Sequence, residues 1–476
     1  MLNPNNNAPT IFVIFGVTGD LAGRKLLPAL LSLYVKKLLP QRFMIVGFAR
    51  RHFNREEFRQ LVREHMYIRP GQYREEDVKH FLDHMCYEQG YFDMKEAYGN
   101  LARRLAEIDD GWKQCSNKLF HLAVSPSLYE TILDRLADSG LTVPCGGDLG
   151  WTRVLVEKPF GNDTETARQL DKKLANLFKE EQIFRIDHYL AKEALQNIMT
   201  FRFSNSLFEP LWNRQHIEKV HVKLLEKIDI EGRGVLYDKL GALKDVGQNH
   251  ILQMLAVVAM DQPVVKAGKG GKEGDLSAAV RRERARILSR LKPISKRILP
   301  RAAVRGQYEG YMQEKGIAPD SQTETYFRLE TYLNTPRWKG VPFFLEAGKA
   351  LAETRAEIDV YFKNPQTKGH AQSHQNILSF RIQPDEGIKI RFWVKTPGYS
   401  LDVEPKNLSF AYRDTPVFNS LPDAYERVLR DAIVGDQMLF TSTDEVLASW
   451  KFITPIVKAW HSGVALTFYK KGAKEV

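Results

Sequence analysis

Residues 11–30 read IFVIFGVTGDLAGRKLLPAL, and this stretch decides the fold of the first part of the chain. The apolar run ending at Phe15 is typical of a buried strand, and the amphipathic run after the glycines is typical of a helix. Gly16 and Gly19 lie between them, where a βαβ unit brings its backbone close to a phosphate. The spacing is not G-x-G-x-x-G, and Lys25 is not followed by the Ser or Thr of a P-loop. Two glycines can simply mark a turn, but the flanking strand and helix favour a nucleotide site.

The same alternation of short apolar runs and helical patterns continues to about residue 186. We expect strands at 10–16, 42–50, 117–126 and 152–160 and a helix at 24–39. Beyond residue 187 the pattern changes to successive strands with short polar turns, expected at 219–228, 356–363, 376–384 and 388–396 after a helix at 192–203. The sequence therefore predicts two domains: an α/β Rossmann-type domain at 1–186, and a larger α+β domain at 187–476 with a mainly antiparallel sheet.

Composition narrows the class of protein. The chain has 476 residues, 43% hydrophobic and 27% charged, as in ordinary soluble globular proteins. No apolar run is long enough to cross a bilayer, and residues 1–10 lack the basic start of a secretory signal. The widely spaced Cys86, Cys115 and Cys145 predict free thiols in a reducing cytoplasm rather than a disulfide framework. No metal-ligand motif is evident, so no metal is expected.

Most of the net charge of +11 comes from residues 281–305. This segment holds ten Lys and Arg residues against one Glu, and the rest of the chain is close to neutral. Apolar residues recur within it at roughly helical spacing, and Pro293 must kink or end that helix. We interpret the segment as a solvated helical face, or as a patch that attracts anionic substrate and cofactor. No nucleic-acid reading motif accompanies the charge, so no nucleic-acid partner is expected.

The end of the second expected strand indicates which nucleotide binds. An NAD enzyme places an acidic residue there for the ribose hydroxyl, whereas this chain has Arg50, Arg51 and His52. A 2′-phosphate carries about −1.5 to −2 charges, so arginines favour NADP over NAD. A surface pair of arginines is the alternative interpretation.

Two later stretches contain side chains that could bind a substrate or accept a proton. In RIDHYLAKE, His188 and Lys192 are four residues apart, so on a helix they would share a face beside Tyr189 and could hold a phosphate monoester. In KDVGQNHILQM, Asp245 and His250 lie on an expected helix whose buried side is formed by Leu252, Leu255 and Val258. A single histidine on such a helix is more often a core residue than a base.

Six motifs in this order resemble those of the glucose-6-phosphate dehydrogenase family: GVTGDLAGRKL, VEKPFG, RIDHYLAKE, EGRGVLYD, KDVGQNHILQM and GVPFFLEAGKAL. The similarity extends over residues 10 to 470. It implies oxidation of D-glucose 6-phosphate at C1 to 6-phospho-D-glucono-1,5-lactone with hydride transfer to NADP, the first oxidative step of the pentose phosphate pathway. It also implies a homodimer or homotetramer assembled through the second domain.

The resemblance assigns roles position by position. His250 would be the general base, and Asp187 would hold it and stabilise its charged form; such a pair fixes the tautomer and raises basicity. The sugar phosphate would be bound by His188, Tyr189 and Lys192. Lys158 would lie between coenzyme and substrate. The sugar hydroxyls would be contacted by Glu226, Asp245 and Lys349. NADP would be bound by Gly16, Val17, Thr18, Gly19, Asp20, Leu21, Ala22, Arg50, Tyr91, Phe92 and Lys158.

The chain departs from the family pattern at four places. Gly23 replaces a basic residue in the turn, Ala191 replaces a glycine, Glu346 replaces Arg or Thr, and Thr354 replaces a basic residue, with Arg355 next to it. Two alternatives stay open. Glu346 and Thr354 leave room for a related NAD(P)-dependent oxidoreductase acting on another sugar or sugar phosphate. The basic segment 281–305 leaves room for a protein that binds sugar phosphates or polyanions without catalysis, although binding alone does not need the Asp187 and His250 pair.

Overall fold

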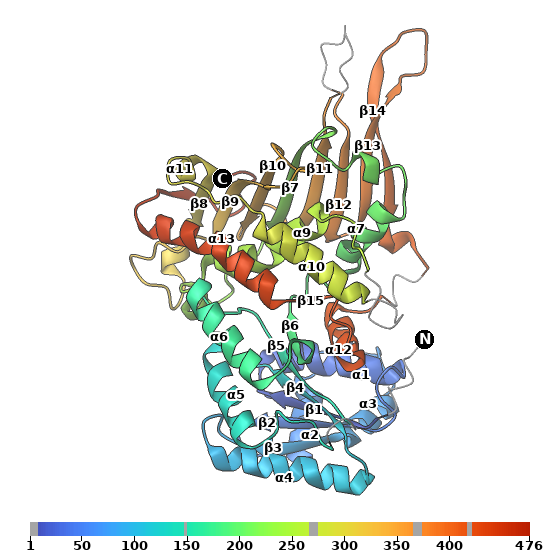
Figure 1. Ribbon diagram of the computed structural model, residues 1–476, viewed down its shortest axis with the longest axis vertical. Helices are drawn as coiled ribbons and strands as arrows, with labels where there is room; N and C mark the ends of the chain where they lie inside the picture. The colour runs from blue at the N-terminus through green and yellow to red at the C-terminus, as the bar shows by residue number, and fades with distance from the viewer. Residues whose placement is uncertain (1–7, 147–149, 266–274, 365–373, 417–420) are drawn as a thin grey trace. The chain divides into compact units, whose positions relative to one another are not determined.

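The computed structural model describes residues 8–146, 150–265, 275–364, 374–416 and 421–476, which form two compact units (Figure 1). The first unit comprises Met1–Gly161, Glu165–Ala191 and Pro422–Thr443. The second comprises Asn162–Thr164, Lys192–Leu421 and Asp444–Val476. Residues 266–277 are rich in glycine and lysine, which predicts a loop, and most of them lie outside the described residues.

The first unit is built on a 7-stranded sheet in the order β15-β6-β5-β4-β1-β2-β3. Its strands are β1 (Thr10–Phe15), β2 (Phe43–Ala49), β3 (Met85–Gln89), β4 (Asn117–Leu122), β5 (Thr152–Val156), β6 (Ile183–Ile186) and β15 (Phe440–Thr441). All neighbouring strands are parallel except β15, which pairs antiparallel with β6. β1 and β4 are buried at every position, as expected for strands covered on both faces. The predicted Rossmann-type fold is confirmed.

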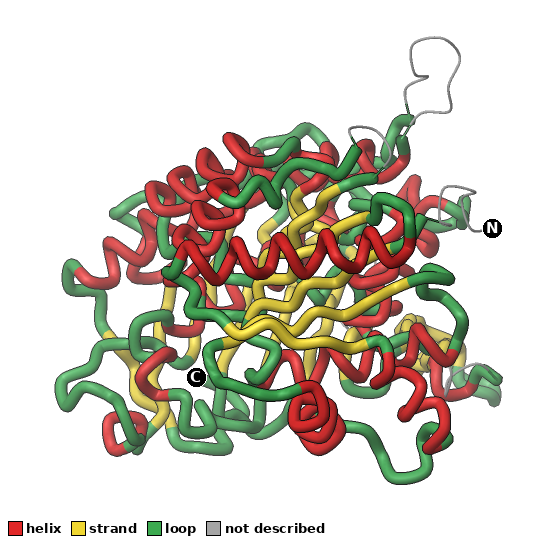
Figure 2. The backbone as a smooth tube through the Cα atoms, turned by 90° about the horizontal axis from the view of Figure 1, so that it is seen from below, coloured by secondary structure: helices red, strands yellow, loops and turns green. Residues whose placement is uncertain are grey.

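Helices connect these parallel strands and pack against them (Figure 2). They are η2 (Ala22–Leu26), α1 (Leu27–Val35), α2 (Arg55–His65), α3 (Glu75–Asp83), α4 (Lys95–Trp112), η3 (Pro126–Leu128), α5 (Tyr129–Asp138), α6 (Thr164–Leu177) and η4 (Glu180–Gln182). A late segment, α12 (Ala424–Val434) with β15, also belongs to this unit. The sequence predicted a single boundary after residue 186. It did not predict that Pro422–Thr443 return to the first unit.

The second unit contains a 9-stranded sheet in the order β14-β13-β12-β11-β7-β10-β9-β8-β16. Its strands are β7 (Ile217–Leu225), β8 (Ala303–Tyr308), β9 (Tyr326–Tyr332), β10 (Pro342–Gly348), β11 (Arg355–Phe362), β12 (Ile377–Gln383), β13 (Gly387–Lys395), β14 (Val403–Ala411) and β16 (Leu466–Tyr469). The pairs β7–β10 and β8–β16 are parallel and the others antiparallel, which confirms a mainly antiparallel sheet.

The helices of this unit include the element that carries His250. They are α7 (Glu193–Phe203), η5 (Glu209–Leu211), α8 (Gly234–Tyr237), η6 (Leu243–Ile251), α9 (Leu252–Ala259), α10 (Leu276–Ser289), α11 (Leu299–Ala302), η7 (Tyr311–Gln313), η8 (Tyr412–Asp414) and α13 (Thr443–His461). Within the described residues, no helix is both long and apolar enough to span a membrane.

The basic segment is less exposed than expected. α10 ends at Ser289, before Pro293, as the proline predicted. Arg284 is buried and its Nε lies 2.7 Å from the buried Oε1 of Glu445, and Arg305 donates to the carbonyl oxygen of Val464 at 2.6 Å. The interpretation of the whole segment as a solvated face is therefore wrong, because Arg284 and Arg305 are buried and bond to other parts of this unit.

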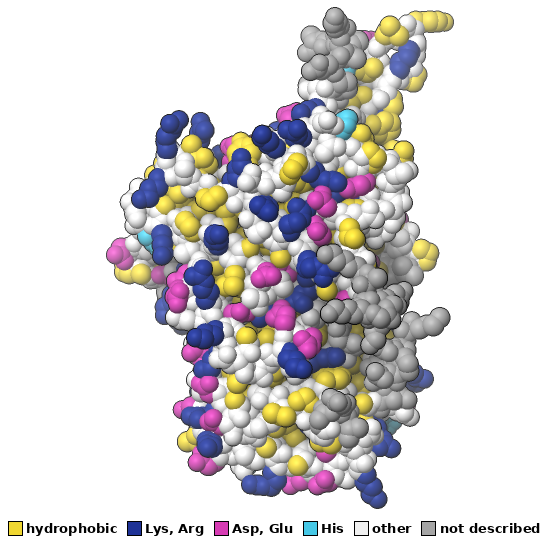
Figure 3. Space-filling view, viewed as in Figure 1, with side chains coloured by type: hydrophobic (Ala, Val, Ile, Leu, Met, Phe, Trp, Pro, Cys, Tyr) yellow, Lys and Arg dark blue, Asp and Glu magenta, His cyan; other side chains and the backbone are white. Residues whose placement is uncertain are grey.

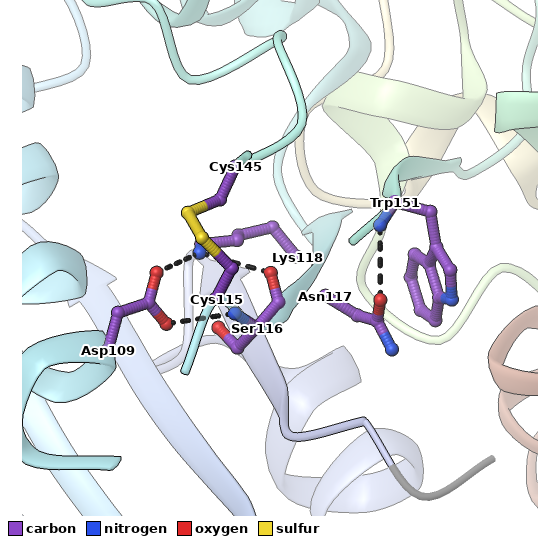
Figure 4. The surroundings of a disulfide bond; sticks show 7 residues. All are labelled: Asp109, Cys115, Ser116, Asn117, Lys118, Cys145 and Trp151. Atoms are coloured by element: carbon purple, nitrogen blue, oxygen red, sulfur yellow. Dashed lines mark hydrogen bonds and ion pairs between the residues drawn. A yellow bond between two sulfur atoms is a disulfide. The ribbon is translucent and has the colours of Figure 1, made fainter. Parts of the chain in front are cut away.

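The expectation of three free thiols is also wrong. Cys115 and Cys145, 30 residues apart, form a disulfide with a Cα–Cα distance of 5.6 Å (Figure 4). Since β4 and β5 are adjacent and parallel, the segments that lead into them are close together, which the cysteine spacing alone does not reveal. Cys86 is free and half-buried, and burial raises the pKa of its thiol to about 11.

Candidate active site

The turn after β1 has the shape of a phosphate cradle. Gly16 has a φ of +78°, and a Cβ there would lie 2.5 Å from the carbonyl oxygen of Ala123. The Gly19 N–H donates to the Gly16 carbonyl oxygen at 2.9 Å, and the helix begins at Asp20. A side chain at Gly16 would collide with the chain after β4, so this position needs glycine. The turn from Gly16 to Ala22 thus presents helix N-terminal N–H groups at the carboxyl ends of the strands, which fits a pyrophosphate.

The two arginines after β2 are free to meet an anion. Arg50 and Arg51 are exposed, and neither makes an ion pair with any residue that the structure describes. Their backbone is held in place: Tyr87 donates to the Arg51 carbonyl oxygen, and the side-chain amide of Gln89 donates to that of Arg50 at 3.1 Å. A fixed backbone with exposed guanidinium groups suits recognition of a 2′-phosphate.

Tyr91 and Phe92 follow β3 and differ in their surroundings. The Tyr91 side chain is 52% exposed. The ring of Phe92 packs against Phe15 and Phe48, with ring centroids 6.4 and 6.0 Å apart, and Tyr98 donates to its carbonyl oxygen at 2.9 Å. Phe92 therefore packs at the carboxyl ends of β1 and β2, and Tyr91 is the more exposed of the two.

The segment containing Lys158 is held by residues that sequence reasoning missed. Tyr129 donates to the carbonyl oxygen of Glu157 at 2.9 Å, and Tyr425 donates to its carboxylate at 3.2 Å. The Lys158–Pro159 peptide bond that follows is cis. Tyr425 comes from α12, 268 positions away in sequence, so no local pattern could have identified it.

Asp187 to Lys192 form a turn, so the prediction that His188 and Lys192 share a helical face is wrong. The buried Asp187 carboxylate accepts the N–H of Tyr189 at 3.0 Å. Such a side-chain-to-backbone bond competes with helix formation. α7 begins only at Glu193, with Lys192 in an extended conformation before it. The rings of His188 and Tyr425 stack with centroids 6.2 Å apart. The first unit thus holds Asp187, His188 and Tyr189, and Lys192 belongs to the second.

His250 lies on η6, which is a π-helix rather than the expected α-helix. A π-helix bonds residues five apart, so Asp245 and His250 lie one turn apart on nearly the same side, whereas in an α-helix they would be about 140° apart. His250 is 2% exposed, and its backbone N–H donates to the side-chain oxygen of Asn249 at 2.7 Å. The predicted buried side is confirmed, since Leu252, Leu255 and Val258 are all inaccessible.

The N-terminal end of η6 is held by Glu324. The buried carboxylate of Glu324 accepts the N–H of Leu243 at 3.0 Å, and its backbone carbonyl accepts that of Ala242 at 2.9 Å. Gly241, with a φ of +72°, leaves room for this carboxylate. Burial raises the pKa of Glu324 to about 7. Glu324 was not among the predicted residues. It precedes β9 and contacts η6 across 81 positions in sequence, so no local pattern connects the two.

Glu226 and Lys349 are brought together at the ends of β7 and β10. Lys349 Nζ lies 2.5 Å from Glu226 Oε2. The backbone N–H of Glu226 donates to the carbonyl oxygen of Gly348 at 2.8 Å, which aligns the two strand ends. Both side chains, like Asp245 and His250, belong to the second unit, so this unit alone holds three of the predicted sugar contacts and the predicted base.

The departures from the family pattern have structural causes at two positions. A side chain on Gly23 would collide with His65, whose backbone oxygen would be 2.6 Å from the added Cβ, so the basic residue is excluded by packing. Ala191 is buried and its φ is not positive, so glycine is not required there.

Glu346 and Thr354 are accommodated by local partners. Burial alone would raise the pKa of Glu346, but the His221 ring and the Tyr326 hydroxyl, 2.8 and 2.9 Å away, lower it below its usual value. Thr354 accepts the N–H of Lys227 at 3.2 Å. Arg355 pairs with Glu353 at 2.7 Å and with Glu357 at 3.6 Å, so its guanidinium is held by two carboxylates of this unit.

Two family models and several known proteins are similar to this chain over nearly its whole length. A family model described as glucose-6-phosphate dehydrogenase, NAD binding domain, matches residues 13–197, and one described as glucose-6-phosphate dehydrogenase, C-terminal domain, matches residues 199–475. Glucose-6-phosphate 1-dehydrogenase of Aggregatibacter actinomycetemcomitans is 40% identical over 471 residues, covering 97% of this chain and 92% of the relative. That of Chlamydia pneumoniae is 38% identical over 486 residues, covering 98% and 92%. A solved glucose-6-phosphate dehydrogenase in complex with glucose 6-phosphate aligns with a TM-score of 0.89 and 32% identity, covering 98% of this chain and 95% of that one.

Proposed function

The chain belongs to the glucose-6-phosphate dehydrogenase family, and from this premise we propose how its residues share the work of the reaction. The enzyme oxidises D-glucose 6-phosphate at C1 to 6-phospho-D-glucono-1,5-lactone with NADP, in the pentose phosphate pathway. The single observation that carries the assignment of residues is η6, whose π-helical turn places Asp245 and the buried His250 on one side.

The residues of the first unit fit NADP. The glycine turn from Gly16 to Ala22 leaves space for a pyrophosphate, and the exposed Arg50 carries charge suited to a 2′-phosphate. Tyr91 is exposed after β3, and Lys158 follows β5, which β4 separates from β1 in the same sheet. When bound, NADP supplies the acceptor for the hydride that leaves C1. The chain's own task is to hold the sugar and to remove a proton.

His250 takes the proton from the C1 hydroxyl. An imidazole in its neutral form can accept a proton at physiological pH, and a carboxylate that fixes its tautomer makes it a better base. We assign that carboxylate to Asp187, whose Oδ1 already accepts the Tyr189 N–H and is thereby oriented. Asp187 thus stabilises the imidazolium formed as the hydride departs.

The remaining polar residues bind the substrate. His188, Tyr189 and Lys192 bind the phosphate group, which suits an imidazole, a phenol and an ammonium group. Glu226, Asp245 and Lys349 bind the sugar hydroxyls, and Lys158 contacts both substrate and coenzyme. The proximity of Glu226 and Lys349, 2.5 Å apart, supports a shared role at the sugar.

The test is the variant His250→Asn. It should reduce kcat for NADP reduction by several orders of magnitude, while the Kd of glucose 6-phosphate, measured by calorimetry, changes by less than about threefold. The matched control is Asn249→Ala, which changes the neighbouring residue of η6 and should retain most of the turnover, so that damage to this helix is excluded as the cause of the loss. Full activity of His250→Asn would show that another group is the base.

A second candidate is oxidation of a different sugar or sugar phosphate on the same architecture. Two observations favour it: Thr354 replaces a basic residue, and Arg355 is held by Glu353 rather than being free to replace it. Initial rates with glucose, glucose 6-phosphate, galactose 6-phosphate and mannose 6-phosphate separate the candidates. Greater kcat/KM for any substrate other than glucose 6-phosphate would favour the second.

We also propose that the protein is a homodimer or homotetramer. The edge hairpin of β13 and β14 supports association: it exposes Tyr399, Leu401 and Leu408, and hydrophobic side chains gather on it in Figure 3. Light scattering should give two or four times the mass of one chain, and a monomer would contradict the proposal. We also propose a cytoplasmic location. Free thiols do not support it, since Cys115 and Cys145 form a disulfide, and cell fractionation would test it.

A further inference from the structure

The buried hydroxyl of Tyr237 has no use in the roles assigned above. Tyr237 is the last residue of α8 and is 4% exposed. Among the described residues, none forms a hydrogen bond with its buried Oη. Buried hydroxyls are nearly always hydrogen-bonded, because leaving one unpaired is costly. The position of this hydroxyl therefore suits a hydrogen-bonding group that comes from outside the chain.

Tyr237 lies in a buried cluster beside one side chain of the proposed sugar site. Lys349 Nζ lies 5.7 Å from the centre of the Tyr237 ring, and the same nitrogen lies 2.5 Å from Glu226. Burial raises the pKa of the Tyr237 hydroxyl well above its usual value, and the carboxylates of Asp245 and Glu324 add to the effect. The hydroxyl thus keeps its proton and is a donor, on a ring that lies near Lys349, one of the side chains assigned to the sugar hydroxyls.

The ring of Tyr237 is held without use of its hydroxyl. It packs edge-to-face against Tyr311, with centroids 6.3 Å apart, and the backbone N–H of Tyr237 donates to the carbonyl oxygen of Arg233 at 2.9 Å. Tyr311 in contrast uses its hydroxyl, which donates to Asp238 at 3.0 Å. The two tyrosines belong to one buried cluster, and only the Tyr311 hydroxyl is bonded within the described residues, which provides a matched pair for experiment.

We propose that the Tyr237 hydroxyl donates a hydrogen bond to a ring hydroxyl of the sugar phosphate and so contributes to substrate specificity. The inference rests on the proposed function, because it places the sugar beside Glu226, Asp245 and Lys349. A site with a buried donor rejects analogues that lack the matching hydroxyl, since the donor is then left unpaired. The bond adds recognition at the sugar to that supplied at the phosphate, and no proton is transferred.

The experiment compares Tyr237→Phe with Tyr311→Phe in the full-length enzyme. Tyr237→Phe should lower kcat/KM for glucose 6-phosphate about tenfold, the loss expected for one hydrogen bond to substrate, with the KM for NADP and the melting temperature unchanged. Tyr311→Phe should lower the melting temperature and leave kcat/KM within about twofold. A structural role for Tyr237 would lower its melting temperature instead.

Deoxy analogues identify the bonded hydroxyl. With 2-deoxy-, 3-deoxy- or 4-deoxyglucose 6-phosphate, the wild type and Tyr237→Phe should become equal for the analogue that lacks the bonded hydroxyl and should differ for the other two. Wild-type kcat/KM in Tyr237→Phe with glucose 6-phosphate, or the same loss with all three analogues, would overturn the inference and leave the proposed function intact. Failure of the wild type to oxidise glucose 6-phosphate would instead overturn the proposed function.

Discussion

Removing the disulfide between Cys115 and Cys145 should destabilise the first unit without altering catalysis. The bond closes a loop of 30 residues, and the chain-entropy relation gives about 3–4 kcal/mol of stabilisation for a loop of this length. For a unit of this size, that corresponds to a fall of roughly 10 °C in melting temperature. The disulfide lies before the amino ends of β4 and β5, whereas the glycine turn follows the carboxyl end of β1, parallel to them. Coenzyme binding should therefore be unaffected.

The assay is thermal unfolding, followed by circular dichroism, of a variant with both cysteines changed to serine. Addition of a thiol reductant to the wild type should lower its melting temperature to that of the variant. The matched control is Cys86→Ser, since Cys86 is the free cysteine, and reductant should lower its melting temperature as it does that of the wild type. The KM for NADP should stay within about twofold in all of them. Equal melting temperatures for the wild type and the double variant would refute the reasoning.

Three further predictions concern the site. Glu324 has a pKa of about 7 in the folded chain against an ordinary 4.5. As the pH rises, the unfolded chain therefore releases this proton first, and the free energy of unfolding falls by about 3 kcal/mol between pH 4.5 and 7. Urea unfolding at pH 5 and pH 8 should show that Glu324→Gln loses this part of the pH dependence, and an unchanged slope would contradict it. Arg50→Ala should lower kcat/KM for NADP by about 10- to 100-fold and leave that for NAD nearly unchanged; equal losses for both coenzymes would exclude a 2′-phosphate contact. Gly16→Ala should weaken NADP binding at least about tenfold in a fluorescence titration, because its φ of +78° and the nearby Ala123 oxygen exclude a Cβ, and an unchanged Kd would place the pyrophosphate elsewhere.

The sequence was most informative where local patterns decide structure. Continuous apolar runs predicted the buried parallel strands, and residues 219–228 and 356–363 predicted β7 and β11, because strand periodicity is a local property. The glycine turn was also predictable, since its strand, glycines and helix are consecutive. The π-helix of η6 was not predicted, and neither was the contact of its first turn with Glu324, which is 81 positions away in sequence.

Other features depend on contacts that no local window contains. The turn at His188 forms because the Asp187 side chain bonds to the backbone, which overrides the helical spacing. Residues 422–443 return to the first unit, where β15 pairs with β6 and Tyr425 reaches Glu157. The charge of Arg284 is buried by a partner on α13. Each of these required the tertiary structure to be seen.

The central claim is that Asp187 and His250 act as one catalytic unit. The most direct measurement is kcat for the wild type, Asp187→Asn, His250→Asn and the double variant. Residues that act as a unit lose their effect together, so the double variant should be no slower than His250→Asn within about threefold. If the two single losses multiply in the double variant, the residues act independently, and the account is contradicted.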